Sequence, residues 1–126
     1  MGRRETPVLL VDDDRTTADL YALKLRLDGL AVVLAHGYRS ALELFERERP
    51  RVACVDHRLP DGPGAELSGE LASRGAAVIL LTNDQETLQR PPPGVREARL
   101  KARTSPAELS AAVRGLLAGG GPGSAG

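Results

Sequence analysis

Near its start the chain carries the segment Val8-Leu9-Leu10-Val11-Asp12-Asp13-Asp14, in which a continuous apolar run stops at three aspartates. Such a run is typical of a parallel strand that is buried on both faces of a sheet. Further short apolar runs lie at 30–34, 52–55 and 78–81, and a weak fifth strand is expected near 98–100. Because helical patterns separate these runs, the sequence predicts an α/β fold with helices on both faces of a five-stranded parallel sheet.

The first helix is expected at 16–27, where Leu20, Leu23 and Leu27 recur at helical spacing and predict its apolar side. Gly29 is suited to end this helix. The other helices are expected at 40–48, 65–73, 84–88 and from 106 onward. The fourth of the five is predicted to be short or distorted, because the run Pro91-Pro92-Pro93-Gly94 cannot continue a helix.

The final helix has the clearest start in the sequence. Ser105, Pro106 and Glu108 occupy the N-cap, first and third helical positions. We therefore expect a single domain over residues 7–118. Residues 1–6 would form an N-terminal extension, and the Gly-rich residues 119–126 would form a flexible tail or an interdomain linker.

Composition excludes several classes of function. Lys and Arg together number 17, as do Asp and Glu, and aromatic residues make up 2% with no Trp. A neutral chain with few aromatic rings is not expected to bind nucleic acid directly. No apolar run approaches the ~20 residues of a membrane span. The single cysteine, Cys54, cannot form an intramolecular disulfide, so we expect a cytoplasmic protein without membrane contact.

Polar residues collect at one edge of the predicted sheet. Asp12, Asp13, Asp56, Thr82 and Lys101 each fall at or just beyond the carboxyl end of an expected strand. In an open parallel sheet these ends line the ligand crevice. Because three carboxylates at short range repel one another, the cluster calls for a cation or for a raised pKa. Mg²⁺ fits best, since it prefers oxygen ligands and takes only one or two carboxylates directly.

At this point the sequence resembles the receiver domain of two-component response regulators. The resemblance spans about residues 7–118 and rests on segments that occur in the family's order, namely Val8-Leu9-Leu10-Val11-Asp12-Asp13-Asp14, Val55-Asp56-His57-Arg58-Leu59-Pro60-Asp61-Gly62, Leu80-Leu81-Thr82 and Leu100-Lys101. It implies a flavodoxin-like, doubly wound sheet with strand order 2-1-3-4-5.

The resemblance also implies a role for each site residue. Asp56 would be the phosphoryl acceptor, and Thr82 and Lys101 would contact the phosphoryl group. Mg²⁺ would be held by Asp12 and Asp13, together with Asp56 and the backbone carbonyl of Arg58. The phosphoryl donor would be a histidine kinase or a phosphotransfer protein, and the output would act through contacts with an unknown protein partner. Self-phosphorylation and autodephosphorylation would be slow, so the chain would be a switch rather than a turnover enzyme.

Three positions depart from the family pattern. Ala102 follows Lys101 where the family usually has proline, so a cis peptide is not expected there. Ala98 stands where the family's switch aromatic usually lies, and Asn83 replaces the small residue that commonly follows the threonine. These residues would modulate phosphorylation, Asn83 by narrowing the approach of the phosphoryl donor.

Other polar residues receive simpler interpretations. Arg58 and Asp84 are hypothesised to form an ion pair that shields the phosphoaspartate from water. Residues 90–103 carry five basic residues against one acidic residue, a local charge of +4, which forms a solvated face or meets an acidic partner. His36 and His57 are expected to be surface or loop groups, because neither has metal-ligand spacing to a second histidine or cysteine.

Two other functions remain open. The chain could be a pseudo-receiver, an interaction module that binds a partner regardless of phosphate. It could instead be a Mg²⁺-dependent phosphohydrolase with Asp56 as nucleophile, although Arg58 stands where a general acid would be needed. An output domain beyond the Gly-rich tail is compatible with the sequence, and we expect a monomer or a weak dimer.

Overall fold

The computed structural model describes residues 6–119. Its centre is a five-stranded sheet in the order β2-β1-β3-β6-β7, in which every neighbouring pair of strands is parallel. The strands are β1 (Val8–Val11), β2 (Val32–Ala35), β3 (Val52–Asp56), β6 (Ala77–Thr82) and β7 (Val95–Leu100). The order matches the predicted 2-1-3-4-5 arrangement, so the flavodoxin-like fold is confirmed.

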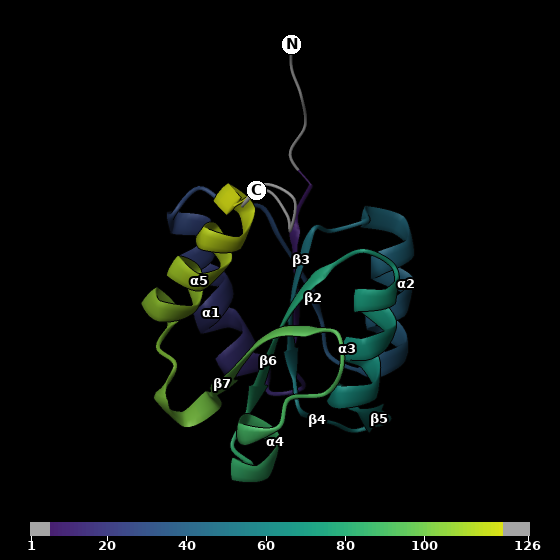
Figure 1. The fold of residues 1–126 in the computed structure, drawn as a ribbon. Coiled ribbons are helices and arrows are strands. Elements are labelled where there is room, and N and C mark those ends of the chain that lie inside the picture. The colour runs from purple at the N-terminus through teal and green to yellow at the C-terminus, as the bar shows by residue number, and fades with distance from the viewer. Residues whose placement is uncertain (1–5, 120–126) are drawn as a thin grey trace.

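Helices cover both faces of this sheet (Figure 1). One face carries α1 (Arg15–Leu27) and α5 (Pro106–Gly119), and the other carries α2 (Tyr38–Glu48) and α3 (Gly64–Ser73). The expected fourth helix, α4 (Gln85–Gln89), is confirmed as short. The 3-10 turn η1 (Lys101–Arg103) follows β7 directly.

The central strands are buried on both faces, as the apolar runs predict. Every side chain of β1 and β3 is buried, and successive residues alternate between two apolar clusters on opposite sides of the sheet. Leu10 and Cys54, for example, pack on the α1 and α5 side, whereas Leu9 and Val55 pack on the α2 and α3 side. The loops at the strand ends therefore start from a rigid base.

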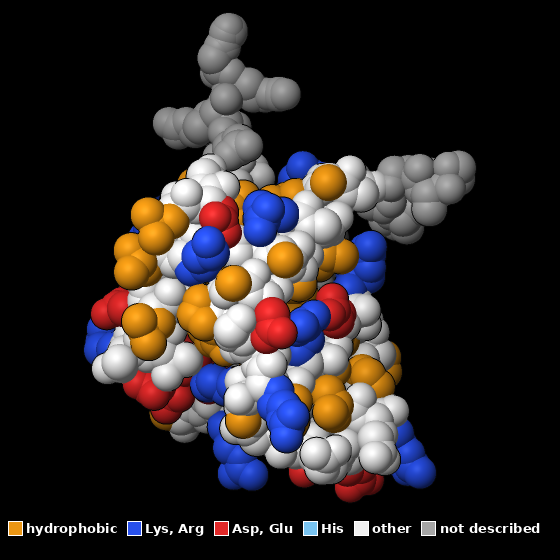
Figure 2. Space-filling model, turned by 90° about the vertical axis from the view of Figure 1, so that its left-hand side faces the viewer, with side chains coloured by type: hydrophobic (Ala, Val, Ile, Leu, Met, Phe, Trp, Pro, Cys, Tyr) orange, Lys and Arg blue, Asp and Glu red, His pale blue; other side chains and the backbone are white. Residues whose placement is uncertain are grey.

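The predicted apolar side of α1 is wrong. Leu20, Leu23 and Leu27 are 55%, 55% and 72% exposed, and the side of the molecule that carries α1 and α5 shows scattered apolar side chains among basic ones (Figure 2). The side chains that α1 buries are Ala18, Tyr21, Ala22 and Leu25. Small alanines let α1 approach the sheet closely, and the buried Tyr21 hydroxyl finds a partner by donating to the carbonyl of Thr104 at 2.9 Å.

Helix ends agree with the sequence signals. Gly29 follows α1 with a φ of +92°, and Ser105 and Glu108 form the reciprocal hydrogen bonds of a capping box at the start of α5. Helix α5 reaches Gly119, one residue into the predicted tail. The rest of that tail and most of the predicted N-terminal extension lie outside the described residues.

A short hairpin follows β3, and its turn lies in the Pro- and Gly-rich stretch at 60–64. It pairs β4 (Arg58–Leu59) with β5 (Gly62–Pro63). Asp61, at its turn, accepts hydrogen bonds from the backbone N–H groups of Tyr38 at 2.6 Å and Arg39 at 3.1 Å, which lowers the pKa of Asp61. The carboxylate thereby caps α2, whose own N-cap position is a glycine without a side chain, and it fastens the loop behind Asp56 to that helix.

Candidate functional site

The predicted acidic residues meet at the carboxyl edge of the sheet, the lower edge in Figure 1. Asp12 and Asp13 follow β1, and Asp56 is the last residue of β3. One carboxylate oxygen from each of the three lies within 4.8 Å of the others. Asp12 and Asp56 are 1% and 6% exposed, whereas Asp13 faces solvent. The structure therefore brings the three carboxylates together at one partly open site.

Lys101 joins this cluster from the end of β7. Its Nζ lies 3.0 Å from Oδ2 of Asp12 and 3.1 Å from Oδ2 of Asp56. Burial works to lower the pKa of Lys101, but the hydrogen bonds and charges of the two carboxylates outweigh it and raise the pKa. The ammonium thus stays protonated between two buried carboxylates.

Asp56 is buried beside a second carboxylate. Burial raises the pKa of this carboxyl, the positive charge of Lys101 works against that, and the negative charge of Asp12 adds to it, so that the pKa is raised. Three carboxylates against one ammonium still leave two negative charges at the site.

The donor set fits a hard divalent cation. Oδ2 of Asp12 is buried, and the Lys101 ammonium lies 3.0 Å from it. Asp13 offers an exposed carboxylate beside it, and Asp56 a third oxygen. Mg²⁺ takes one or two carboxylates and retains water or phosphate oxygens in its remaining positions. The three aspartates could hold such an ion, and the part played by the carbonyl of Arg58 stays a prediction.

Replacing Asp56 by asparagine should make the fold more stable at neutral pH. A carboxyl whose pKa is raised on folding binds protons more tightly when folded, so it costs stability once the pH exceeds the folded pKa. We expect Asp56→Asn to raise the free energy of unfolding at pH 7, and to raise it by less as the pH falls toward the pKa of an unfolded aspartate. Urea unfolding at several pH values measures this, and a difference that grows as the pH falls would contradict it.

Thr82 ends β6 and is 1% exposed. Its Oγ1 accepts the backbone N–H of Asp84 at 2.9 Å and lies 2.8 Å from Nδ1 of His57. The sequence interpretation of the two histidines as surface or loop groups is therefore too simple. His57 touches Thr82, and Nδ1 of His36 lies 2.9 Å from the carbonyl oxygen of Asp12. In the sequence, the only indication that His57 lies near the site is its position directly after Asp56.

The loop that carries Lys101 is held from two sides. The backbone N–H of Ala102 donates to Oδ1 of Asn83 at 2.8 Å, a bond that a proline at this position could not make. On the other side, Tyr21 donates to the carbonyl of Thr104. Residues 6–119 contain no cis peptide bond, as expected for an alanine after Lys101.

The hypothesised ion pair between Arg58 and Asp84 is wrong. No ion pair of the described residues joins them, and both side chains are exposed. Asp84 instead caps α4 by accepting from the N–H of Thr87 at 2.9 Å and from its hydroxyl at 2.6 Å, and these bonds lower the pKa of Asp84. Ala98 lies in β7, half-buried and paired with Leu80, outside the acidic cluster.

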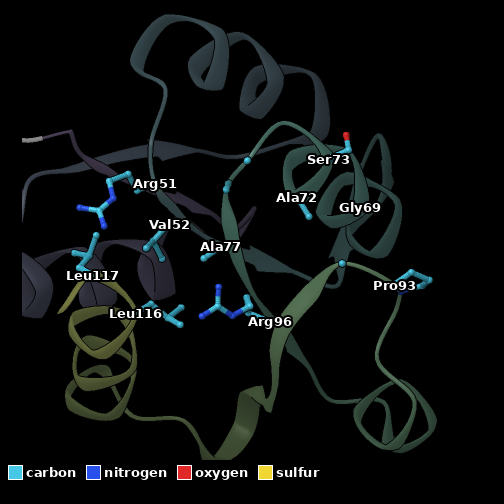
Figure 3. A pocket seen from close by; sticks show the side chains of 13 residues that line it. Arg51, Val52, Gly69, Ala72, Ser73, Ala77, Pro93, Arg96, Leu116 and Leu117 are labelled. Atoms are coloured by element: carbon cyan, nitrogen blue, oxygen red, sulfur yellow. The ribbon is translucent and has the colours of Figure 1, made fainter. Parts of the chain in front are cut away.

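A pocket of about 630 Å³ lies at the opposite, amino-terminal ends of the strands (Figure 3). Val52 and Ala77 line it, and Arg51 and Arg96 extend toward Leu116 and Leu117 of α5. None of the predicted site residues lines this pocket. The pocket is therefore separate from the acidic cluster.

Residues 8–91 match the family model for the response regulator receiver domain. The chain is 36% identical over 77 residues to the probable transcriptional regulatory protein TcrX of Mycobacterium tuberculosis, a match that covers 60% of this chain and 33% of TcrX. The chain spans about a third to a half of the length of the curated relatives it matches.

Solved receiver structures share the fold along nearly the whole chain. The receiver domain protein (CheY-like) of Methanospirillum hungatei superposes with a TM-score of 0.79 and 25% identity, covering 91% of this chain and 95% of that one. TrrA of Thermotoga maritima, solved in complex with Mg²⁺-BeF, gives a TM-score of 0.79 at 24% identity, covering 89% of this chain and 99% of that one.

Proposed function

We infer that this chain, which belongs to the response regulator receiver domain family, is a phosphorylation-dependent signalling switch that accepts a phosphoryl group on Asp56. The observation that carries the proposal is the placement of Asp56 at the carboxyl edge of the sheet, within 4.8 Å of two further carboxylates and 3.1 Å from the ammonium of Lys101. A nucleophile, candidate metal ligands and a fixed positive charge meet there.

The chemistry is a transfer between two nucleophiles. A carboxylate oxygen of Asp56 attacks the phosphorus of a phosphohistidine, so that an O–P bond forms while the N–P bond breaks, and the imidazole leaves with a proton from water. Lys101 would shift its contact from the Asp56 carboxylate to a phosphoryl oxygen. Mg²⁺, when bound by Asp12 and Asp13, neutralises charge on the transferred group.

Receiver domains of this family interact with histidine kinases in two-component systems. We propose such a kinase, or a phosphotransfer protein, as the donor for this chain, and a protein partner in the cytoplasm as its target. Each chain would accept one phosphoryl group, and its self-phosphorylation and autodephosphorylation would be slow. Direct binding to nucleic acid is not proposed for this domain. Among residues 6–119, no helix is both long and apolar enough to cross a bilayer.

One observation favours a second candidate. Ala98 in β7 has a small side chain, so this position has no aromatic ring whose rotation could be coupled to movement of Thr82. If the site is uncoupled from the surface in this way, the chain is a pseudo-receiver that binds its partner with or without phosphate. Equal partner affinity for the phosphorylated protein and for Asp56→Asn would favour this second candidate.

Beryllofluoride, which mimics a phosphoryl group on an aspartate, tests the proposal. We expect it to shift backbone NMR signals around Asp56, Thr82 and Lys101 in the presence of Mg²⁺. Chelation of the metal with EDTA should reverse the shifts, because two uncompensated negative charges would then repel the anion. Asp56→Asn is the control, and a spectrum that does not respond in the wild-type chain would contradict the proposal.

A further inference from the structure

The buried hydroxyl of Thr82 is already engaged in the structure. Thr82 is 1% exposed, so its Oγ1 must find its partners within the protein. The N–H of Asp84 occupies one lone pair at 2.9 Å, and Nδ1 of His57 lies 2.8 Å away. A threonine hydroxyl has a single proton to donate, and the 2.8 Å contact places Nδ1 of His57 within reach of it.

We propose that Thr82 donates this proton to Nδ1 of His57, and that His57 is a positioning residue that competes with the phosphoryl group for the Thr82 hydroxyl. The inference rests on the proposed function, in which Thr82 contacts a phosphoryl group on Asp56. His57 then carries its own ring proton on Nε2. Because one proton cannot serve two acceptors, Thr82 leaves His57 when it binds the phosphoryl group.

Hydrogen bonds fix the backbone of His57 next to β6. The N–H of His57 donates to the carbonyl of Leu81 at 2.8 Å, which continues the pairing of β3 with β6 by one residue beyond β3. The carbonyl of His57 in turn accepts the N–H of Gly64 at 2.8 Å. His57 therefore lies directly after the strand that carries Asp56, next to the strand that carries Thr82.

Release of Thr82 would be transmitted along the chain. Thr82 Oγ1 holds the N–H of Asp84, and the carboxylate of Asp84 holds both the N–H and the hydroxyl of Thr87 in α4. These bonds join His57, Thr82 and the first turn of α4 in one hydrogen-bonded series. The bond between His57 and Thr82 thus favours the resting position of this segment, without needing an aromatic ring at Ala98.

Beryllofluoride affinity in four variants tests the competition. His57→Leu replaces the ring with an apolar side chain that cannot accept a hydrogen bond, and we expect it to tighten binding about 3- to 10-fold, as loss of one competing hydrogen bond would. His57→Asn restores an acceptor near the position of Nδ1 and should bind as the wild type does. In a Thr82→Val background, His57→Leu should leave the beryllofluoride affinity unchanged, because the hydroxyl is absent. An equal effect of His57→Leu with and without the Thr82 hydroxyl would overturn the proposal.

A second measurement needs neither metal nor phosphate. The ¹⁵N signal of Nδ1 in His57 should carry the shift of a hydrogen-bonded acceptor, and Thr82→Val should move it toward that of an unbonded ring nitrogen. A signal that Thr82→Val leaves unchanged overturns the proposal, whether or not beryllofluoride binds. Absence of beryllofluoride binding by the wild type would instead refute the proposed function, and the ring signal would still decide whether His57 holds Thr82.

Discussion

Lys101→Met should slow phosphoryl transfer to Asp56 by about 100-fold or more, the usual effect of removing one preorganised charge from a transition state. The Lys101 ammonium lies 3.1 Å from the Asp56 carboxylate and 3.0 Å from that of Asp12. Without it, the incoming phosphoryl group would meet carboxylates with no fixed counter-charge from the protein. The rate of phosphorylation by acetyl phosphate with saturating Mg²⁺, followed by mass, measures the effect.

Lys24→Met is the matched control, because the sequence contains a second lysine far from the site. Lys24 pairs with Asp28 at the end of α1, and its side chain is 38% exposed. We expect its replacement to leave the rate within about twofold of the wild type, since exposed ion pairs contribute little. Equal rates for Lys101→Met and Lys24→Met would show that Lys101 has no part in the transfer.

Gly64→Ala should destabilise the fold by about 3 kcal/mol and disturb the site at the same time. Gly64 begins α3 and is buried against the end of β3. A Cβ at this position would lie 2.0 Å from the carbonyl oxygen of Asp56 and 2.9 Å from Cα of His57. Both neighbours are backbone, so no side-chain rotation relieves the contact, and the segment that carries Asp56 must move.

Gly115→Ala provides the comparison for that substitution. Gly115 is exposed in α5, and an added Cβ would meet nothing within 4 Å. Because alanine has a higher helix propensity than glycine, the change should leave the free energy of unfolding unchanged or raise it by up to about 1 kcal/mol. Urea unfolding of both variants separates the two effects, and a Gly64→Ala protein as stable as the wild type would contradict the packing described for the end of β3.

The sequence predicted the sheet and the position of its acidic edge because both depend on local patterns. Apolar runs that stop at polar residues mark buried parallel strands, and Asp12 and Asp56 lie at the ends of such runs. The strand before Lys101 is only partly buried and gives a weaker signal. Parallel topology then brings the strand ends together. The short length of α4 could also be predicted from the sequence, because a proline run follows this helix.

Other features depend on tertiary contacts that no local pattern encodes. The exposed face of α1 carries Leu20 and Leu23, which the helical period alone cannot distinguish from its buried face of alanines and Tyr21. Asp61 caps a helix that starts 23 residues before it, and His57 meets Thr82 across 25 residues. Such pairs become visible only once strand register and loop paths are known.

The intact mass of the chain after incubation with acetyl phosphate and Mg²⁺, beside Asp56→Asn treated in the same way, tests the central claim most directly. The account predicts that the wild type gains the mass of one phosphoryl group and that Asp56→Asn gains none. A phosphoryl group on the Asp56→Asn chain would place the acceptor elsewhere. A wild-type chain that gains no mass and also gives no response to beryllofluoride would contradict the account and leave the phosphate-independent module.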